Sequence, residues 1–337
     1  MRRIISSFRY LAFLYLLLNS STVKAQIESD NSLPVNSDVI KNGINFKING
    51  GTARGNNLFH SFQKFNVPNG GEAFFDNTNS IENIFTRVTG GSISNIDGII
   101  KANGSANLFL MNPSGIIFGE NSRLNIGGSF LSAINPQAPP LLTINIPVGL
   151  QIGTNPGEII VKGSGHNLKV EDINFSPYMN PGSSSLLKVK PGKKLSLIGG
   201  DIKLNGATLN AAMGKIELSS IKDGEFNLNE NTISPNSKLG NIQLSQQSLI
   251  DVSGAGAGSI QIKGDSVSLN NGSILLIQNQ GLQTAGDIDV NAAESLEING
   301  ISADGKIRSA IVNETLAGNS GNIYVVTPRL MMQNGAG

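Results

Sequence analysis

The chain has 337 residues, a formal net charge of +1 and no cysteine. Without cysteine it can form neither a disulfide nor a thiolate metal site, and its balanced charge argues against a nucleic-acid-binding surface. With 40 glycines, no tryptophan and 5% aromatic residues, the composition favours many short strands joined by turns over a helical fold.

The first 25 residues have the pattern of a secretory signal peptide. Three arginines form a basic start, residues 11–18 form an apolar core, and Val23-Lys24-Ala25 has the small residues of a cleavage site. Eight apolar residues are too few for a membrane anchor, which needs about 20. We therefore expect export, with cleavage after Ala25. Residues 1–25 hold four of the 25 basic residues and none of the 24 acidic ones, so the mature chain has a net charge of −3.

The segment from residue 26 to 147 is denser in aromatic residues than the rest of the chain. Ten of the 14 phenylalanines lie between Phe46 and Phe130, and only Phe175 and Phe226 follow. The segment ends in NPQAPPLLTINIP (135–147), whose prolines exclude a helix and disfavour a central strand. We interpret 26–147 as an N-terminal domain that ends in an irregular crossing segment.

Within this domain, NLFLMNPSGIIFG (107–119) places a turn between two strands that are apolar on both faces. Pro113 fixes φ at the second turn position, Gly115 accepts a positive φ, and Asn112 can hydrogen-bond the turn backbone through its side chain. We predict a tight reversal here. One face of the strands would meet the core, and the other would be covered by a further sheet or hairpin of the N-terminal cap.

The segment from residue 148 to 337 repeats the pattern Gly-x-Ile-x-aliphatic, with mostly polar residues between the apolar ones. This alternation is typical of strands with one buried face. Because the strand is constant and the spacing is not, we predict an all-β fold: a right-handed parallel β-helix (solenoid) with an N-terminal β cap and extra-helical hairpins. An antiparallel sandwich or barrel is the alternative, but it gives no reason for the repeat. The copies are GEIIV (157–161), GDIKL (200–204), GKIEL (214–218), GNIQL (240–244), GSIQI (258–262), GDIDV (286–290) and GNIYV (321–325).

A single coil of such a solenoid cannot fold alone. About five buried aliphatic side chains supply roughly 10 kcal/mol, whereas ordering a coil of about 20 residues costs roughly 20 to 30 kcal/mol. Each coil therefore needs the hydrogen bonds and the apolar surface of a neighbour. We expect growth from a nucleus, and the aromatic-rich N-terminal domain is the candidate for it.

Three blocks of the chain, in this order, resemble the secretion domain of two-partner secretion exoproteins of the filamentous haemagglutinin type. This version is most similar to cyanobacterial members. The Gly-x-Ile repeats resemble the β-helical shaft of the same family, so we assign residues 148–337 to such a shaft. The blocks are LFHSFQKFNVPNGGEAFF (58–75), IENIFTRVTGGSISNIDGIIKANGSANLFLMNPSGIIFGENSRLNIGGSFLSA (81–133) and VGLQIGTNPGEIIV (148–161).

The resemblance points to two sets of residues. A further Asn-Pro-Asn-Leu motif, present in some members, has no match here. The family's Asn-Pro-Asn-Gly-Ile secretion motif maps onto Asn112, Pro113, Ser114, Gly115 and Ile116, with Ser114 in place of the second Asn. A second conserved block of the family maps onto His60, Phe62, Phe65, Asn66 and Val67.

The resemblance also implies a route and a role. The chain would pass through the periplasm of a Gram-negative-type bacterium, and the periplasmic domains of an outer-membrane β-barrel transporter would bind its secretion domain. It would then fold outside, secreted or held at the cell surface. Members of the family commonly act as adhesins, haemagglutinins or toxins, so an adhesin-like exoprotein is the predicted function. The sequence does not name a receptor.

The remaining residues suggest no catalytic or metal site. His60 and His166 are the only histidines, and we expect no cofactor and no metal. The alternative function is a secreted β-helical enzyme acting on polysaccharide, which would need paired carboxylates. We predict no enzyme because the acids fall at different places in the repeat: Asp201, Asp251, Asp265, Asp287 and Asp304.

The sequence stops at RLMMQNGAG (329–337), within a strand-and-turn pattern. No polar cap follows the last strand pattern. We therefore expect a shaft that is truncated at its C-terminus, with an unpaired sheet edge there.

Overall fold

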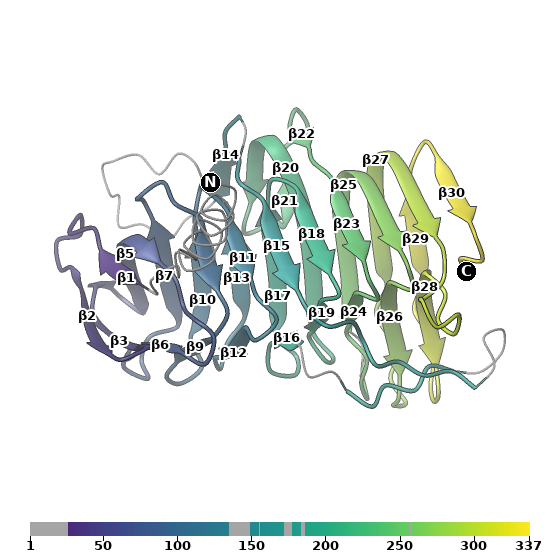
Figure 1. The fold of residues 1–337 in the computed structure, drawn as a ribbon, viewed down its shortest axis with the longest axis horizontal. Coiled ribbons are helices and arrows are strands. Elements are labelled where there is room, and N and C mark those ends of the chain that lie inside the picture. Colours follow the sequence, from purple (N-terminus) through teal and green to yellow (C-terminus); the bar gives the residue numbers. More distant parts are fainter. Residues whose placement is uncertain (1–25, 135–148, 155, 172–176, 183–185, 257) are drawn as a thin grey trace, which may run out of the picture.

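The computed structural model describes residues 26–134, 149–154, 156–171, 177–182, 186–256 and 258–337. The predicted signal peptide (1–25) and nearly all of the proline-rich segment lie outside these residues. The described residues form strands, turns and loops (Figure 1). None of them belongs to a helix long and apolar enough to cross a membrane.

Each coil has three sides, and strands of successive coils pair in parallel along each side (Figure 1). On the first side, for example, Leu108 pairs with Phe130, and Phe130 pairs with Leu195. The strands of this side are β5 (Asn57–Phe65), β7 (Asn83–Val88), β10 (Asn107–Met111), β13 (Phe130–Ala133), β17 (Lys194–Gly199), the first part of β20 (Lys215–Asn227), the first parts of β25 (Ser259–Asn270) and β27 (Ile288–Asn299), and β29 (Ile323–Val326).

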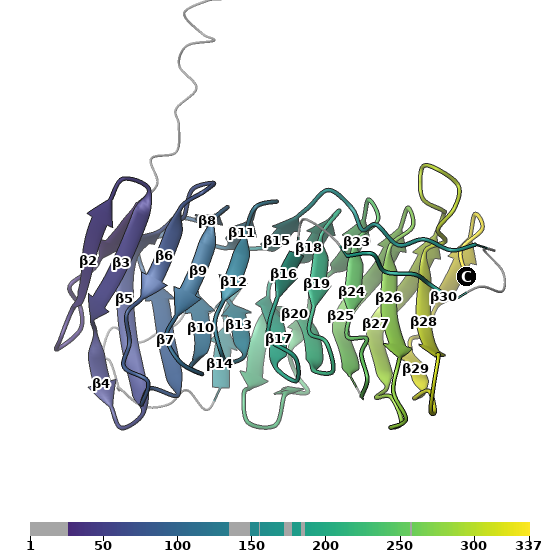
Figure 2. The ribbon, with the colours of Figure 1, turned by 90° about the horizontal axis from the view of Figure 1, so that it is seen from below.

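The second side follows the first around one corner of the helix. Its strands are β8 (Ser94–Ile96), β11 (Ile116–Phe118), β15 (Ile159–Lys162), β18 (Ile202–Asn205), β23 (Ile242–Ser245), the later parts of β25 and β27, and β30 (Leu330–Gln333). The third side, which faces the viewer in Figure 2, consists of two sheets. They contain β3 (Asn45–Gly50), β6 (Glu72–Phe75), β9 (Ile99–Ala102) and β12 (Arg123–Asn125), then β16 (Leu186–Lys188), β19 (Thr208–Asn210), β24 (Leu249–Asp251), β26 (Ile274–Asn279) and β28 (Ala310–Thr315).

The repeated isoleucines explain how the coils share one core. Each is in register with an apolar residue of a neighbouring coil, so the side chains stack along the helix axis. One continuous apolar cluster runs inside the helix from Ile27 to Ile298. The predicted parallel β-helix is thereby confirmed. The stacks are Ile159, Ile202 and Ile242 on the second side, and Ile216, Ile260, Ile288 and Ile323 on the first.

The repeated glycines lie where backbones of neighbouring coils approach most closely. A Cβ atom on Gly200 would lie 2.5 Å from the carbonyl oxygen of Gly157. A Cβ atom on Gly286 would lie 2.3 Å from the carbonyl oxygen of Gly258, and one on Gly321 would lie 2.1 Å from that of Gly286. Real Cβ atoms do not reach such distances, so close packing of the coils requires glycine at these positions.

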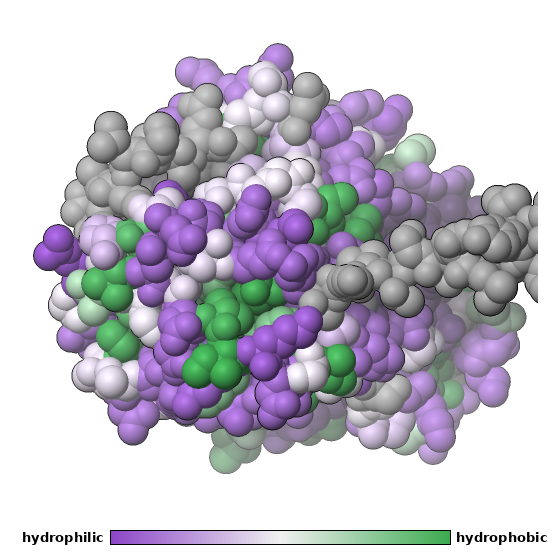
Figure 3. All heavy atoms as spheres, turned by 60° about the vertical axis from the view of Figure 1, so that its left-hand side comes forward, coloured by the Kyte–Doolittle hydropathy of each residue, from purple (hydrophilic) through white to green (hydrophobic). Residues whose placement is uncertain are grey.

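A small β cap covers the N-terminal end of the core. Strand β2 (Ser37–Asn42) pairs antiparallel with β3, while β1 (Ile27–Ser29) and β4 (Thr52–Arg54) pair antiparallel with β5. Seen from this end, apolar patches are small and separated by polar residues (Figure 3). At the other end, the inward-facing Ile323 and Val325 of the last coil are 43% and 38% exposed.

The phenylalanines of the N-terminal half form two groups. Phe62, Phe65, Phe75, Phe118 and Phe130 are fully buried inside the helix. A second group stacks on the outer surface of the first side, with ring centroids of Phe59 and Phe85 separated by 5.2 Å and those of Phe85 and Phe109 by 4.5 Å. Strand β10 is therefore apolar on both faces because both of its faces are packed.

The cover over β10 is extra-helical, as predicted, but most of it does not come from the cap. Strand β14 (Gly149–Ile152) and the outer part of β20 pair antiparallel, and β21 (Thr232–Ile233) adds to them; β22 (Lys238–Leu239) also pairs with β20. Phe109 and Met111 pack against the apolar cluster that this small sheet shares with the first side. The cap supplies Leu33, beside the outer phenylalanines. The prediction that the cap provides this cover was wrong, because most of the covering strands lie far along the chain.

Replacement of Gly286 by Ala should lower the free energy of unfolding by about 2 kcal/mol, because the added methyl group overlaps the backbone of the preceding coil. Gly256→Ala is the matched control, since its Cβ would meet nothing closer than 3.5 Å. Urea denaturation followed by circular dichroism measures both. Equal midpoints for the two variants would contradict the close-approach explanation.

Candidate functional site

Both predicted motifs lie at one corner of the helix, between the first and second sides. The block that starts at His60 runs along β5 and passes this corner at Asn66, after which Val67 pairs with Ile96 near β8. The Asn112–Ile116 motif passes the same corner between β10 and β11. Residues 89–93 occupy it in the coil between them. The fold therefore stacks two motifs that are separate in the sequence.

Asn112 is fully buried at this corner and joins two coils. Its side-chain amide donates to the carbonyl oxygen of Ser92 and to Oγ of Ser94, both at 2.9 Å. Its Oδ1 accepts the backbone N–H of Ser114 at 2.9 Å, as predicted from the turn sequence. One side chain thus braces the turn and fixes it to the preceding coil.

The turn backbone is also fixed to the following coil. The N–H of Gly157 donates to the carbonyl oxygen of Pro113 at 3.1 Å. Gly115 has the predicted positive φ, 113°, and a Cβ atom there would lie 2.9 Å from the carbonyl oxygen of Glu158. The motif is therefore held between two neighbours, and its glycine is required by both conformation and contact.

The turn is a corner of the coil and not the expected reversal. Strand β10 pairs in parallel with β7 and β13, whereas β11 pairs in parallel with β8 and β15. The two strands that flank the turn do not pair with each other, because in a parallel solenoid each strand finds its partners in the neighbouring coils. A hydrogen bond of 3.1 Å from the N–H of Gly115 to the carbonyl oxygen of Asn112 closes the turn.

The second predicted block also contributes buried side chains. Phe62, Phe65 and Val67 belong to the core inside the helix. Oδ1 of Asn66 accepts the N–H of Asn95 in the next coil at 2.8 Å. Like Asn112, Asn66 thus uses its amide to link two coils at the shared corner. Neither motif presents its side chains mainly to solvent.

His60 points into the core, in register with Thr86 of the next coil. Its Nδ1 lies 2.9 Å from Oγ of Ser37, whereas its Nε2 has no partner among the described residues. Burial lowers the pKa of His60 from 6.5 to about 4. Thr86 Oγ1 and Ser132 Oγ, in the same inward-facing row, also lack partners within the described part of the chain.

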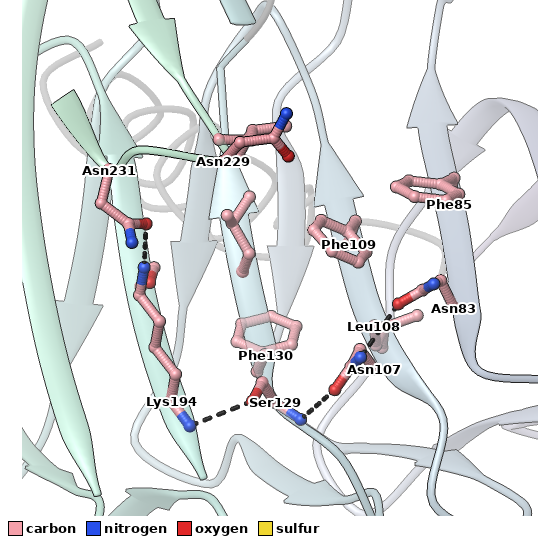
Figure 4. Close-up of a pocket in the computed structure, with 13 residues that line it drawn as sticks. Asn83, Phe85, Asn107, Leu108, Phe109, Ser129, Phe130, Lys194, Asn229 and Asn231 are labelled. Carbon is pink, nitrogen blue, oxygen red and sulfur yellow. Dashed lines mark hydrogen bonds between the residues drawn. The ribbon is translucent and has the colours of Figure 1, made fainter. Parts of the chain in front are cut away.

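A groove of about 300 Å³ opens on the outer surface of the first side, next to the outer phenylalanines (Figure 4). Phe109, Leu131 and Leu228 give it an apolar wall. A connected row of polar groups forms the other wall: Asn83 donates to Asn57, Asn107 donates to Asn83, the Ser129 N–H donates to Asn107, and the Lys194 N–H donates to Ser129, at 2.8–3.1 Å.

Sequence reasoning missed this groove, although a signal for it was present. Asn-aliphatic-Phe occurs three times, as Asn57-Leu58-Phe59, Asn83-Ile84-Phe85 and Asn107-Leu108-Phe109. In each copy the aliphatic residue faces inward, while the Asn and Phe face outward and stack on those of the next coil. The repeat therefore builds an amide row beside an aromatic row.

The extra-helical hairpin between β20 and β21 forms the rim of the groove. Nζ of Lys194 donates to Oδ1 of Asn231 in this hairpin (Figure 4). It also lies 2.6 Å from Oε2 of Glu217, which is fully buried. The cation is therefore compensated, and the charge of the groove is close to neutral.

Four of the five acids considered for a polysaccharide-cleaving enzyme make structural contacts through their side chains. Asp201 and Asp287 accept the backbone N–H groups of Asn241 and Asn322 at 2.8 and 2.7 Å. Asp251 and Asp304 brace turns next to Ser253 and Lys306 in the same way. Within the described residues, no group of three or more His, Cys, Asp or Glu side chains is placed to hold a metal ion.

Comparison with known proteins identifies the family of the chain. The model of the TPS secretion domain family matches residues 25–262, and the chain therefore belongs to this family. Among solved structures, the crystal structure of the HMW1 secretion domain from Haemophilus influenzae is similar. Its sequence identity is 17% and its TM-score 0.46, with 91% of this chain and 99% of that chain covered. No curated protein matches the chain.

Family membership gives the route of the protein. A TPS secretion domain marks an exoprotein of a Gram-negative bacterium that is exported to the cell surface or the extracellular space with a partner outer-membrane transporter. The matched residues extend past residue 147 into the Gly-x-Ile repeats. The predicted boundary at 147 stays a prediction.

Replacement of Asn112 by Ala should lower the free energy of unfolding by about 3 kcal/mol, because it leaves the buried hydroxyl of Ser94 and half-buried backbone groups of Ser92 and Ser114 without this partner. Ser114→Ala is the control, since only the backbone of Ser114 is bonded in the turn. Urea denaturation compares the two variants. Unchanged stability in Asn112→Ala would show that the corner does not depend on this side chain.

The stability of the protein should also decrease as the pH is lowered, because of His60. The unfolded chain binds a proton at His60 below about pH 6.5, whereas the folded chain does so only near pH 4. Acidification across this window therefore favours unfolding, by up to about 3 kcal/mol. Burial lowers the pKa of His166 as well, so that residue acts in the same direction.

The measurement is the unfolding free energy of the protein and of His60→Asn between pH 7 and pH 4. The asparagine keeps a polar atom near Ser37 but does not titrate. The slope should be smaller in the variant, with the remainder due to His166 and to carboxylates. Identical slopes would mean that His60 binds its proton equally well in the folded and unfolded chains.

Proposed function

We propose that the protein is a non-enzymatic, adhesin-like exoprotein that acts at the cell surface or after release. The observation that carries this proposal is the groove on the first side, which combines a neutral, partly apolar lining with a fixed row of amides. Such a lining suits binding, because a few placed polar groups beside an apolar wall orient a ligand without reacting with it.

The transporter contact is part of the same proposal. We propose that the periplasmic domains of the transporter recognise the secretion domain before it folds. In support, the side chains of both motifs are mainly buried in the folded protein, so they are accessible as a set only in the extended chain. In the folded state, Asn112 and Gly115 serve the structure of the corner.

The binding role draws support from how the groove is built. Its floor belongs to the regular coils, but its rim belongs to the hairpin inserted after β20, which the coil itself does not need. Glu217, the acid that pairs with Lys194 of the groove, is buried. A buried, paired carboxylate is a poor general acid or base, and a neutral lining favours an uncharged ligand.

The test uses bacteria that express the protein with its transporter, and agglutination of a panel of erythrocytes by the released protein. The protein should reach the surface or the medium only when the transporter is present, and it should bind at least one erythrocyte type. Asn83→Ala combined with Asn229→Ala should weaken that binding roughly thirtyfold, because each of the two lost hydrogen bonds contributes about 1 kcal/mol.

Asn291→Ala is the matched control, because Asn291 is an exposed amide on the first side outside the groove. Equal secretion and equal unfolding midpoints of all variants make the comparison valid. Absence of binding to every cell type would contradict the adhesive role. Unchanged binding by the double variant would show that the ligand binds outside the groove.

A further inference from the structure

Between β15 and β16 the chain leaves its coil, runs along the third side and returns (Figures 1 and 2). Residues 163–171 form the outgoing arm and residues 177–182 the returning arm; residues 172–176 lie outside the described part. Lys169 and Met179 exchange two backbone hydrogen bonds of 2.8 and 2.9 Å, which join the arms. We call these two arms the clasp.

The outgoing arm is bonded to the corners of coils that come later in the chain. Gly165 donates its N–H to the carbonyl oxygen of Gly206 at 2.7 Å, and His166 donates its N–H to that of Gln247 at 2.9 Å. Nε2 of His166 lies 2.8 Å from the carbonyl oxygen of Gly272. The arm therefore crosses successive coils instead of joining one of them.

Leu168 anchors the outgoing arm. It is 6% exposed and packs in one cluster with Leu249, Ile274, Leu276 and Ile307. These residues form an apolar strip on the outer surface of β24, β26 and the turn before β28. The clasp covers an outer apolar surface of the third side, just as the small extra-helical sheet covers one on the first side.

The returning arm reaches the most distant coil. The N–H of Tyr178 donates to Oε1 of Glu314 at 3.0 Å, and Nε2 of Gln278 donates to the carbonyl oxygen of Tyr178 at 2.7 Å. Nδ2 of Asn180 donates to Oδ2 of Asp251 at 2.9 Å. Three coils are thus tied to one segment that precedes them.

The sequence order of these contacts has a consequence for folding. The partners of the clasp lie 71 residues further along the chain for Asn180, 106 for His166 and 136 for Tyr178. A coil needs only its neighbour, but the clasp has no complete binding surface until β28 has been added. Loops of this length also close slowly compared with the addition of one coil.

We infer that the clasp docks only after β28 has been added, and that its docking locks the coils of β24, β26 and β28 into one cooperative unit. The lock rests on the proposed export, which delivers the chain progressively. Segments before β28 would remain separable while export continues. Once residue 314 is outside, the folded coils would resist unfolding together.

Hydrogen exchange of the full chain tests the lock at equilibrium. Leu168→Ala should accelerate exchange of amides in β24, β26 and β28 roughly tenfold or more, because it removes the anchor from a packed cluster. Amides of β6 and β9, on the same side but beyond the reach of the clasp, should not change. Lys169→Ala is the matched control on the same arm, since its side chain is exposed.

The order of docking needs a second measurement, and the cysteine-free chain allows it. Purified Leu168→Cys and Ser132→Cys proteins are refolded from urea and pulsed with an alkylating reagent. Ser132 lies in the core near the N-terminal end, so its thiol should become protected first and the thiol at position 168 last. Simultaneous or earlier protection at 168 would overturn late docking. Unchanged exchange in Leu168→Ala would overturn the lock.

Both measurements use purified protein without a transporter or target cells. Failure of the lock would therefore leave the proposed adhesive role untouched. Loss of erythrocyte binding would in turn leave the lock untouched.

Discussion

The close approach of neighbouring coils is the constraint on which the structure depends. Each coil is short of stabilising interactions until the backbone of the next coil is hydrogen-bonded to it and its aliphatic side chains are covered. Glycine at the start of a repeat permits that approach, as at Gly200 and Gly286, where any side chain would meet a carbonyl oxygen. The same requirement explains why the isoleucine that follows is in register from coil to coil.

This constraint also decides where the chain can vary. A strand inside a ladder has partners in both neighbouring coils, so an insertion there would break two sets of hydrogen bonds. A corner lies between strands, so an insertion there interrupts no ladder. The large departures from the coil all occur at corners: β14 before β15, the hairpin within and after β20, and the clasp after β15. Each departure returns to cover an outer apolar surface. The insertions therefore add a second layer and long-range contacts to a one-dimensional stack.

The sequence predicted what depends on local periodicity. The Gly-x-Ile repeat gave the strands and their inward face, and Asn112 to Gly115 gave the turn with its positive φ and its side-chain bond. It did not predict that β10 and β11 part at a corner, because a turn of the same composition serves in hairpins and solenoids. Nor could it place Phe226 in the cluster against which Phe109 packs, since that packing depends on where a distant hairpin folds back. The groove was predictable only in part. Its Asn-aliphatic-Phe repeat can be seen in the sequence, but the hairpin that forms its rim cannot.

The hydrogen bonds of polar side chains differ in how far apart in the sequence their partners lie. Asn66 and Asn112 link coils whose residues follow closely in the chain, so these amides can bond as soon as the next coil forms. The clasp contacts of Tyr178 and His166 depend on coils that come much later. A chain that crosses a membrane unfolded must not lock its structure before enough of it is outside. On the proposed order of docking, the short-range bonds at the N-terminal corner belong to nucleation and the long-range bonds at the clasp belong to locking.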